Sequence, residues 1–146
     1  MINNRTLYAI EALIELANSR DYSSTAQTIS ESKKVPGKFL PQILSSLSNY
    51  GMVISTRGFG GGVRLAKPPE KITLLQILES MQNNIFFFDY MADQNYAAEG
   101  ISNLVLKAFG NAQDAMKKEL GNVTLRDIAG RANAKPKVTG KGKRKK

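Results

Sequence analysis

Residues 58–62, of which four are glycine, constrain the fold of this chain more than any other stretch. Glycine takes positive φ without strain, and β-prone segments at residues 52–56 and 63–66 flank the run, which predicts a hairpin with a flexible tip. An amphipathic segment at residues 38–50 precedes it, after a shorter helical segment and a Lys-Lys-Val-Pro-Gly turn. This order predicts a mainly α fold with a small β-hairpin wing, a winged helix-turn-helix that places one helix in a DNA major groove.

Apolar residues at helical spacing predict two helices before that turn. The first spans residues 5–19, and its expected inward residues are Leu7, Ile10, Leu13, Ile14 and Ala17. The second begins after Ser24, which forms a capping-box pattern with Gln27 three positions later. Its expected inward residues are Ala26 and Ile29.

The third helix is the candidate recognition helix. Its expected core residues are Ile43, Leu44, Leu47 and either Phe39 or Leu40. Its expected outward residues are Lys38, Gln42, Ser45, Ser46 and Asn49. Proline is harmless only in the first turn of a helix, so the helix begins near Lys38 or kinks at Pro41. Gly51 then ends it as a C-cap.

After the hairpin, Thr73 is expected to cap a short helix, and residues 82–100 to form a loop or a loosely helical connector. Apolar residues recur at helical spacing again from residue 101 over about 20 residues, which predicts a helix ~30 Å long. Its apolar stripe is longer than one small domain can cover. This predicts a homodimer. The expected interface residues are Ile101, Leu104, Val105, Ala108, Ala112 and Met116. Gly121 ends this helix, and Thr124 with Asp127 caps a short final helix.

We therefore expect three parts in the chain. Residues 1–81 form the winged helix-turn-helix DNA-binding domain, and residues 82–131 form the connector, the dimerisation helix and the short C-terminal helix. Residues 132–146 carry seven Lys or Arg and no acids and form a disordered basic tail. The tail either adds salt-sensitive DNA affinity or is a solubilising extension. Residues 33–71 hold seven basic side chains against one acid, so the body's positive charge gathers on the expected DNA face.

The composition excludes several classes of function. The chain has no cysteine and no histidine, so it has no disulfide framework, thiolate metal site or histidine base, and we expect neither an enzyme nor a bound cofactor or metal. The longest nearly apolar run, residues 85–91, is far shorter than the ~20 residues that span a bilayer. We expect a soluble cytoplasmic protein with no membrane partner. No Lys-Ser or Lys-Thr follows the glycine run, which disfavours a nucleotide phosphate loop.

Basic, amide and glycine residues of this region are the candidate contacts to double-stranded DNA. Gln42 can pair bidentately with adenine, and Lys38 can reach guanine. The two arginines at the base of the hairpin either enter a minor groove or are ordinary solvated strand residues. The paired lysines of the turn either contact phosphates or are solvated. The candidate DNA-binding residues are Arg5, Thr25, Lys33, Lys34, Lys38, Phe39, Gln42, Ser45, Arg57, Gly58, Phe59, Gly60, Gly61 and Arg64.

Several spaced elements across residues 5–81 form a pattern of their own. They are Tyr8-Ala9-Ile10, Leu13, Leu16-Ala17, Phe39-Leu40, Gln42-Ile43-Leu44, Leu47, Gly51-Met52-Val53, Arg57-Gly58, Gly61-Gly62, Leu65-Ala66 and Ile72-Thr73-Leu74. This pattern resembles the Rrf2-type winged-helix transcriptional regulators, a family that includes iron-sulfur, nitric-oxide-responsive and cysteine-metabolism regulators. The resemblance is specific over this range and general for the long helix beyond it.

The resemblance implies a bacterial, homodimeric DNA-binding protein, usually a repressor, whose long helix crosses between subunits. It implies base reading by Lys38 and Gln42 and a minor-groove contact by Arg57. Cluster-binding relatives carry three cysteines in the connector, whereas residues 82–100 have none, so no iron-sulfur cluster is expected. The chain also departs from the family at Pro41, where an acid is common, and at the first residue after the glycines, which is often aromatic.

We therefore predict a sequence-specific DNA-binding transcriptional regulator, a homodimeric repressor without an iron-sulfur cluster. The alternative is a winged-helix protein-interaction module with non-specific nucleic-acid affinity. The Phe-Phe-Phe run at residues 86–88 packs in the core or the subunit interface, or it lines a pocket for an unidentified small-molecule or protein effector.

Overall fold

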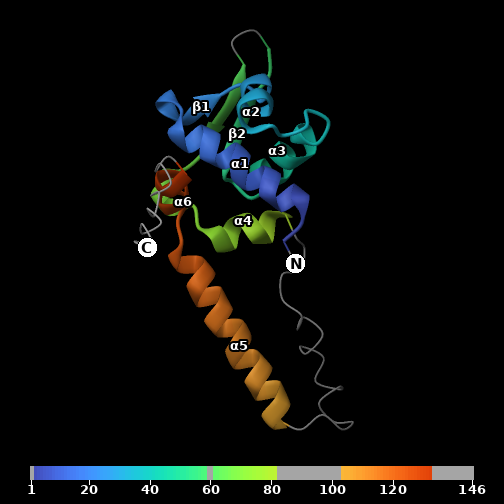
Figure 1. Cartoon of the computed structure of the whole chain (residues 1–146), viewed down its shortest axis with the longest axis vertical. Helices are drawn as coiled ribbons and strands as arrows, with labels where there is room; N and C mark the ends of the chain where they lie inside the picture. The colour runs from blue at the N-terminus through green and yellow to red at the C-terminus, as the bar shows by residue number, and fades with distance from the viewer. Residues whose placement is uncertain (1, 59–60, 82–102, 133–146) are drawn as a thin grey trace, which may run out of the picture.

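The computed structural model describes residues 2–58, 61–81 and 103–132 (Figure 1). The elements in chain order are α1 (Asn4–Asn18), η1 (Arg20–Tyr22), β1 (Ser23–Ser24), α2 (Ala26–Lys33), α3 (Leu40–Asn49), β2 (Val53–Thr56), β3 (Gly62–Leu65), η2 (Pro69–Lys71), α4 (Leu74–Met81), α5 (Asn103–Asn122) and α6 (Leu125–Ala132). Figure 1 shows a body of short helices around a small sheet, from which α5 extends as a single long arm. The predicted mainly α fold with a hairpin wing is confirmed.

The sheet has three antiparallel strands in the order β1-β3-β2. Strands β2 and β3 form the predicted hairpin, with Val53 opposite Leu65 and Thr56 opposite Gly62. Strand β1 was absent from the sequence prediction, because two serines carry no strand signal on their own. It pairs Ser24 with Val63 and so joins the base of the wing to the start of α2.

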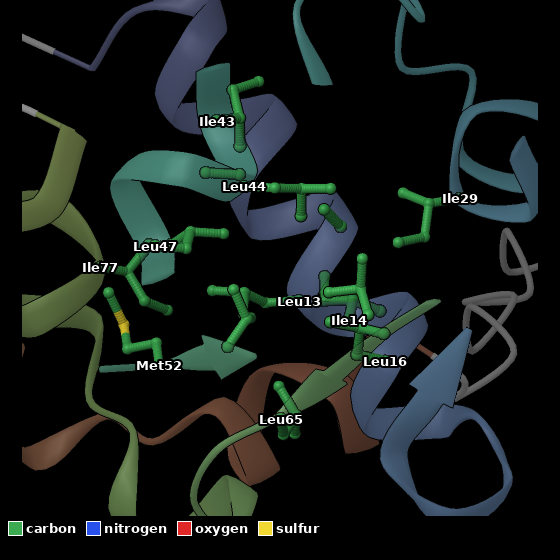
Figure 2. Close-up of a cluster of buried hydrophobic side chains, with 14 of the residues drawn as sticks. Leu13, Ile14, Leu16, Ile29, Ile43, Leu44, Leu47, Met52, Leu65 and Ile77 are labelled. Atoms are coloured by element: carbon green, nitrogen blue, oxygen red, sulfur yellow. The ribbon is translucent and has the colours of Figure 1, made fainter. Parts of the chain in front are cut away.

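One hydrophobic core joins the helices of the body to the sheet. Figure 2 shows side chains from α1, α2, α3, α4 and the strands converging on it, with Leu13 near the centre. Fully burying a side chain of this size contributes about 1.5–3 kcal/mol. The largest side chains that are almost completely buried are Leu13, Leu16, Ile29, Leu40, Ile43, Leu47, Met52, Ile72, Ile77 and Leu125.

The inward face of α1 was predicted only in part. Leu13 is buried as expected, but Leu7 is 49% exposed. Ala9, Ala12 and Leu16 are fully buried instead. The helix packs against α2, α3, α4 and α6 at once, so its buried arc is wider than one apolar stripe, and small alanines allow these neighbours to approach closely.

The start of α2 also differs from the prediction. Its N-cap is Thr25, whose Oγ1 accepts a 3.0 Å hydrogen bond from the Thr28 backbone N–H. Ser24 lies in β1 instead, and Ala26 is exposed, while Ile29 is buried as predicted. Adjacent hydroxyl residues can each cap a helix, and the pairing of Ser24 with the wing decides between them.

Helix α3 begins at Leu40, so Pro41 falls in its first turn and Lys38 lies in the preceding turn rather than in the helix. The helix ends at Asn49, and Gly51 follows the C-cap Tyr50 with a φ of +68°, the left-handed conformation expected of a terminating glycine. The Met52 N–H donates to the Leu47 carbonyl at 3.0 Å, and the Gly51 N–H donates to the Ser48 carbonyl at 2.9 Å. These two hydrogen bonds form a Schellman motif, which turns the chain directly into β2.

The end of the chain returns to the body. Thr73 and Thr124 cap α4 and α6 as predicted, through paired hydrogen bonds with Gln76 and Asp127. The expectation that Gly121 ends α5 was wrong, because the helix runs through Asn122. The division at residues 1–81 and 82–131 stays a prediction, but two residues of α6 lie in the core of the first range.

Those two residues are Leu125 and Ala129. At the surface, Arg126 of α6 donates from Nε to Glu70 Oε1 at 2.8 Å and from a terminal nitrogen to the Tyr22 hydroxyl at 2.9 Å. The pKa of Glu70 lies below its ordinary value because its own backbone amide and then Arg126 donate to the carboxylate. Core packing and these bonds therefore fix the end of the α5 arm to the body.

Candidate nucleic-acid interface

The solvent face of α3 presents Gln42, Ser45 and Asn49, all exposed. These residues recur at helical spacing, so their side chains share one face. The opposite face holds Leu40, Ile43, Leu44 and Leu47, all buried as predicted. Burial of those four side chains therefore sets the direction in which the amides and the hydroxyl point.

The wing extends beside this face. Its turn is closed by a 2.9 Å hydrogen bond from the Gly61 N–H to the Gly58 carbonyl, and Gly58 has a φ of +99°. A Cβ on Gly61 would overlap the Thr56 carbonyl oxygen, so only glycine fits there. Arg57 is exposed beside the turn. The predicted contacts Phe59 and Gly60 lie outside the described residues.

A groove of about 550 Å³ separates α3 from the wing. Hydroxyl groups and one cation dominate its polar lining, and none of the described residues that line it is a carboxylate. Its polar lining residues are Thr25, Ser45, Ser48, Asn49, Ser55, Thr56 and Arg57. The start of α2 opens onto the same groove, where free backbone N–H groups attract negative charge. The groove is therefore suited to a phosphate-bearing strand.

The other predicted cations are spread around this groove. Arg64 is exposed on β3 opposite Ser23 and Ile54, outside the groove lining. Lys33 Nζ lies 4.0 Å from a Glu11 carboxylate oxygen, and Lys34, with a φ of +54°, ends α2 in an exposed position. The structure therefore brings Thr25, Ser45, Arg57, Gly58 and Gly61 together and leaves these three cations apart.

The opposite flank of α3 carries a second group of predicted residues. Arg5 donates from a terminal nitrogen to Ser46 Oγ at 3.0 Å. Lys38 Nζ lies 4.9 Å from the centroid of the Phe39 ring. That ring stacks on Tyr8, with centroids 5.9 Å apart. Sequence reasoning missed Tyr8 as a site residue because its partner lies on another helix, and no local signal could have shown the contact.

The predicted dimer-interface residues form an uncovered stripe on α5. Leu104 is 77% exposed, Val105 is 41% exposed and Met116 is 39% exposed. Ala108 and Ala112 are exposed between them, and Ile101 lies outside the described residues. The prediction omitted Phe109, which is 45% exposed on the same side of the helix. No helix in the described ranges combines the length and hydropathy of a membrane span.

The chain is similar to known transcriptional regulators over most of its length. A family model described as Rrf2, iron-dependent transcriptional regulator, matches residues 2–131. A Synechocystis sequence, slr0846, whose name places it among HTH-type transcriptional regulators, is 30% identical over 129 residues, 87% of this chain and 86% of its own length. The HTH-type transcriptional regulator CymR of Bacillus subtilis is 28% identical over 129 residues, 88% of each chain.

Solved structures agree with these similarities. The structure of CymR, described as the global cysteine regulator of B. subtilis, superposes with a TM-score of 0.68 at 27% identity, over 90% of this chain and 97% of its own. IscR of T. potens superposes with a TM-score of 0.69 over 90% of this chain and 88% of its own. At 20% identity, the second likeness shows the fold alone.

Proposed function

Since this chain belongs to the Rrf2 family and is a DNA-binding transcriptional regulator, we propose that it is a homodimeric repressor that reads its operator with α3 and the wing. The observation that carries this proposal is the exposed α3 face of Gln42, Ser45 and Asn49 beside a groove that Arg57 lines and whose described lining residues include no carboxylate. An amide face of this kind suits base edges, and the groove suits the backbone next to them.

In this proposal α3 lies in the major groove, where Gln42 pairs bidentately with an adenine. Arg57 extends from the wing toward the adjacent minor groove, whose negative potential is strongest where it is narrow. Two subunits then bind half-sites about one helical turn apart, and the operator is approximately palindromic. A dimer bound over a promoter represses transcription by excluding RNA polymerase. It acts in the cytoplasm, where bacterial DNA lies.

The uncovered stripe of α5 supports the dimer. Leu104, Val105 and Phe109 are large apolar side chains with 41% to 77% exposure, which is unfavourable on an isolated arm. A second copy of the same helix offers a matching stripe, as a two-fold interface requires. We propose that α5 pairs with its counterpart in the second subunit.

The iron named in the family description does not fit the donor set of this chain. Thiolate and imidazole ligands are absent, because the sequence has no cysteine and no histidine. The described residues also contain no group of three or more carboxylates that could hold a metal ion. We therefore propose a regulator without an iron-sulfur cluster, whose signal is another small molecule or a protein.

The experiment that tests the reading role is Gln42→Ala. A duplex selected in vitro from random DNA serves as the operator, and Kd is measured on it and on an unrelated duplex. We expect a loss of about 1–3 kcal/mol on the operator and little change on unrelated DNA, because one base-specific pair is lost. Asn18→Ala, an exposed amide at the end of α1, is the matched control. Equal weakening on both duplexes would remove Gln42 from the reading role.

A further inference from the structure

Two side chains of α1 hold the flank of α3 that faces away from the wing. Arg5 bonds Ser46, and Tyr8 stacks on Phe39. Arg5 and Tyr8 are three residues apart on one helix, and Phe39 and Ser46 lie two turns apart on the other, so the pairs form one continuous edge. With Lys38 above the Phe39 ring, these five residues are the α1–α3 rim.

The rim has more donors than it uses. Arg5 Nε is buried without a hydrogen-bond partner among the described residues. In the same ranges no carboxylate pairs with Lys38, and the Tyr8 hydroxyl makes no hydrogen bond there. Phe39 remains 40% exposed although it is large and apolar. An edge with spare cationic and hydroxyl donors and no carboxylate among its five residues has the chemistry of an anion site.

The position of the rim identifies the anion. Pro41, Leu44 and Ser45 of α3 line the wing groove, whereas Phe39 and Ser46 lie on the other flank of the helix. A helix in a major groove about 12 Å wide has a phosphate backbone along each flank. The wing groove faces one of these two DNA phosphate backbones, so the other phosphate backbone lies beside the rim.

We infer that the α1–α3 rim is a second phosphate-binding edge, in which the Tyr8 hydroxyl and the Lys38 ammonium contact backbone oxygens. The inference rests on the proposed placement of α3 in the major groove. Tyr8 acts twice in it. Its hydroxyl donates to a phosphate, and its ring holds Phe39 under Lys38, so Phe39 is a positioning residue for the ammonium. Lys38 then positions the protein and reads no base.

The test measures Kd of the full-length protein on the selected operator and on unrelated DNA across a salt series. Tyr8→Phe keeps the stack and removes the hydroxyl, so affinity falls about three- to tenfold on both duplexes. The slope of log affinity against log salt concentration stays unchanged, because no charge is lost. Lys38→Gln lowers the slope by about one, because one counterion fewer is released. Phe39→Leu keeps the charge, so it weakens both complexes several-fold and leaves the slope near the wild-type value.

Tyr22→Phe and Lys118→Gln remove the same groups away from α3 and are the controls. Operators with a neutral methylphosphonate at single positions supply the second readout. At one position the methylphosphonate should weaken binding of the wild-type protein but cause no further loss of affinity in Tyr8→Phe, which already lacks that contact. A general loss of folding cannot produce this position-specific difference. Unchanged affinity of Tyr8→Phe, or a loss confined to the operator, would overturn the inference. Failure to select any operator would instead count against the proposed function, because the rim is also measured on unrelated DNA.

Discussion

At the scale of single residues, Gly61 is the position where the wing admits no side chain. A Cβ there would overlap the Thr56 carbonyl oxygen and would lie 2.8 Å from the Gly58 carbonyl oxygen, and both are backbone atoms. We predict that Gly61→Ala displaces the wing tip and weakens operator binding at least tenfold, about 1.4 kcal/mol, in a binding titration. The body should still unfold cooperatively, because Gly61 lies outside the core.

Gly130→Ala is the matched control for this substitution. Gly130 lies in α6, and a methyl group added to its Cα would meet nothing within 4 Å, so alanine should leave DNA binding unchanged and favour the helix. If Gly61→Ala bound the operator as tightly as Gly130→Ala, the wing tip would have no part in recognition.

Local signals in the sequence predicted the caps of α4 and α6, although they misplaced the cap of α2 by one residue. Thr73 was identified because apolar residues at helical spacing follow it, and Thr124 because Asp127 follows three positions later. Arg5 and Ser46 are 41 positions apart, and their contact exists only because α1 and α3 pack together. The exposed face of α3 that we propose contacts DNA was therefore predictable from the sequence, whereas the contact of its flank with Tyr8 was not.

At the scale of elements, α6 depends on a carboxylate at its N-terminus. The pKa of Asp127 lies below its ordinary value of 3.8 because the Thr124 backbone N–H, and then its hydroxyl, donate to the carboxylate. A carboxylate whose pKa is lower in the folded state stabilises the protein at pH values above its unfolded-state pKa. This stabilisation is lost as the pH falls through the folded-state pKa.

We therefore predict a pH-dependent difference between the wild-type protein and Asp127→Asn. The free energy of unfolding, measured with urea, should differ by a constant amount from pH 7 to about 5, and the difference should shrink below pH 3.8. A difference that stayed constant down to pH 2.5 would show that the charge of Asp127 does not stabilise the cap.

Helix α6 is also part of the core, although it follows the long arm in sequence. Leu125 is fully buried, and its backbone N–H donates to the Ile72 carbonyl at 2.7 Å. We predict that Leu125→Ala lowers the free energy of unfolding by about 2–5 kcal/mol, through lost burial and the cavity left behind. Leu7→Ala on α1 is the control, since Leu7 is 49% exposed. Equal effects would mean that α6 is not anchored in the core.

The elements themselves were largely predictable, and their faces less so. Capping residues and glycines set most boundaries, but β1 exists only because Ser24 meets Val63 of the wing. Leu7 and Leu16 look equally apolar in the sequence, yet only Leu16 is buried. Which of several apolar arcs faces inward is decided by neighbouring helices, and a sequence pattern does not contain that information.

At the scale of the whole molecule, the wing and the N-terminal end of α5 lie at opposite ends (Figure 1). The body holds one α3 and one wing, enough for one half-site, while α5 carries apolar side chains away from it. Pairing two arms would link two half-site contacts, so that the second binds at a high effective concentration. The affinity for an operator should therefore depend on α5 even though α5 touches no base in this arrangement.

We predict that Ala112→Glu, in the middle of the exposed α5 stripe, converts a dimer into a monomer, because a charge would be buried without a partner. Sedimentation velocity should show half the mass, and affinity for a two-half-site operator should fall at least tenfold, while a single half-site is bound as before. Gly110→Glu adds the same charge two residues away, where a Cβ would meet nothing within 4 Å and would point to the other side of the helix. It should remain dimeric, and a dimeric Ala112→Glu would place the subunit contact elsewhere.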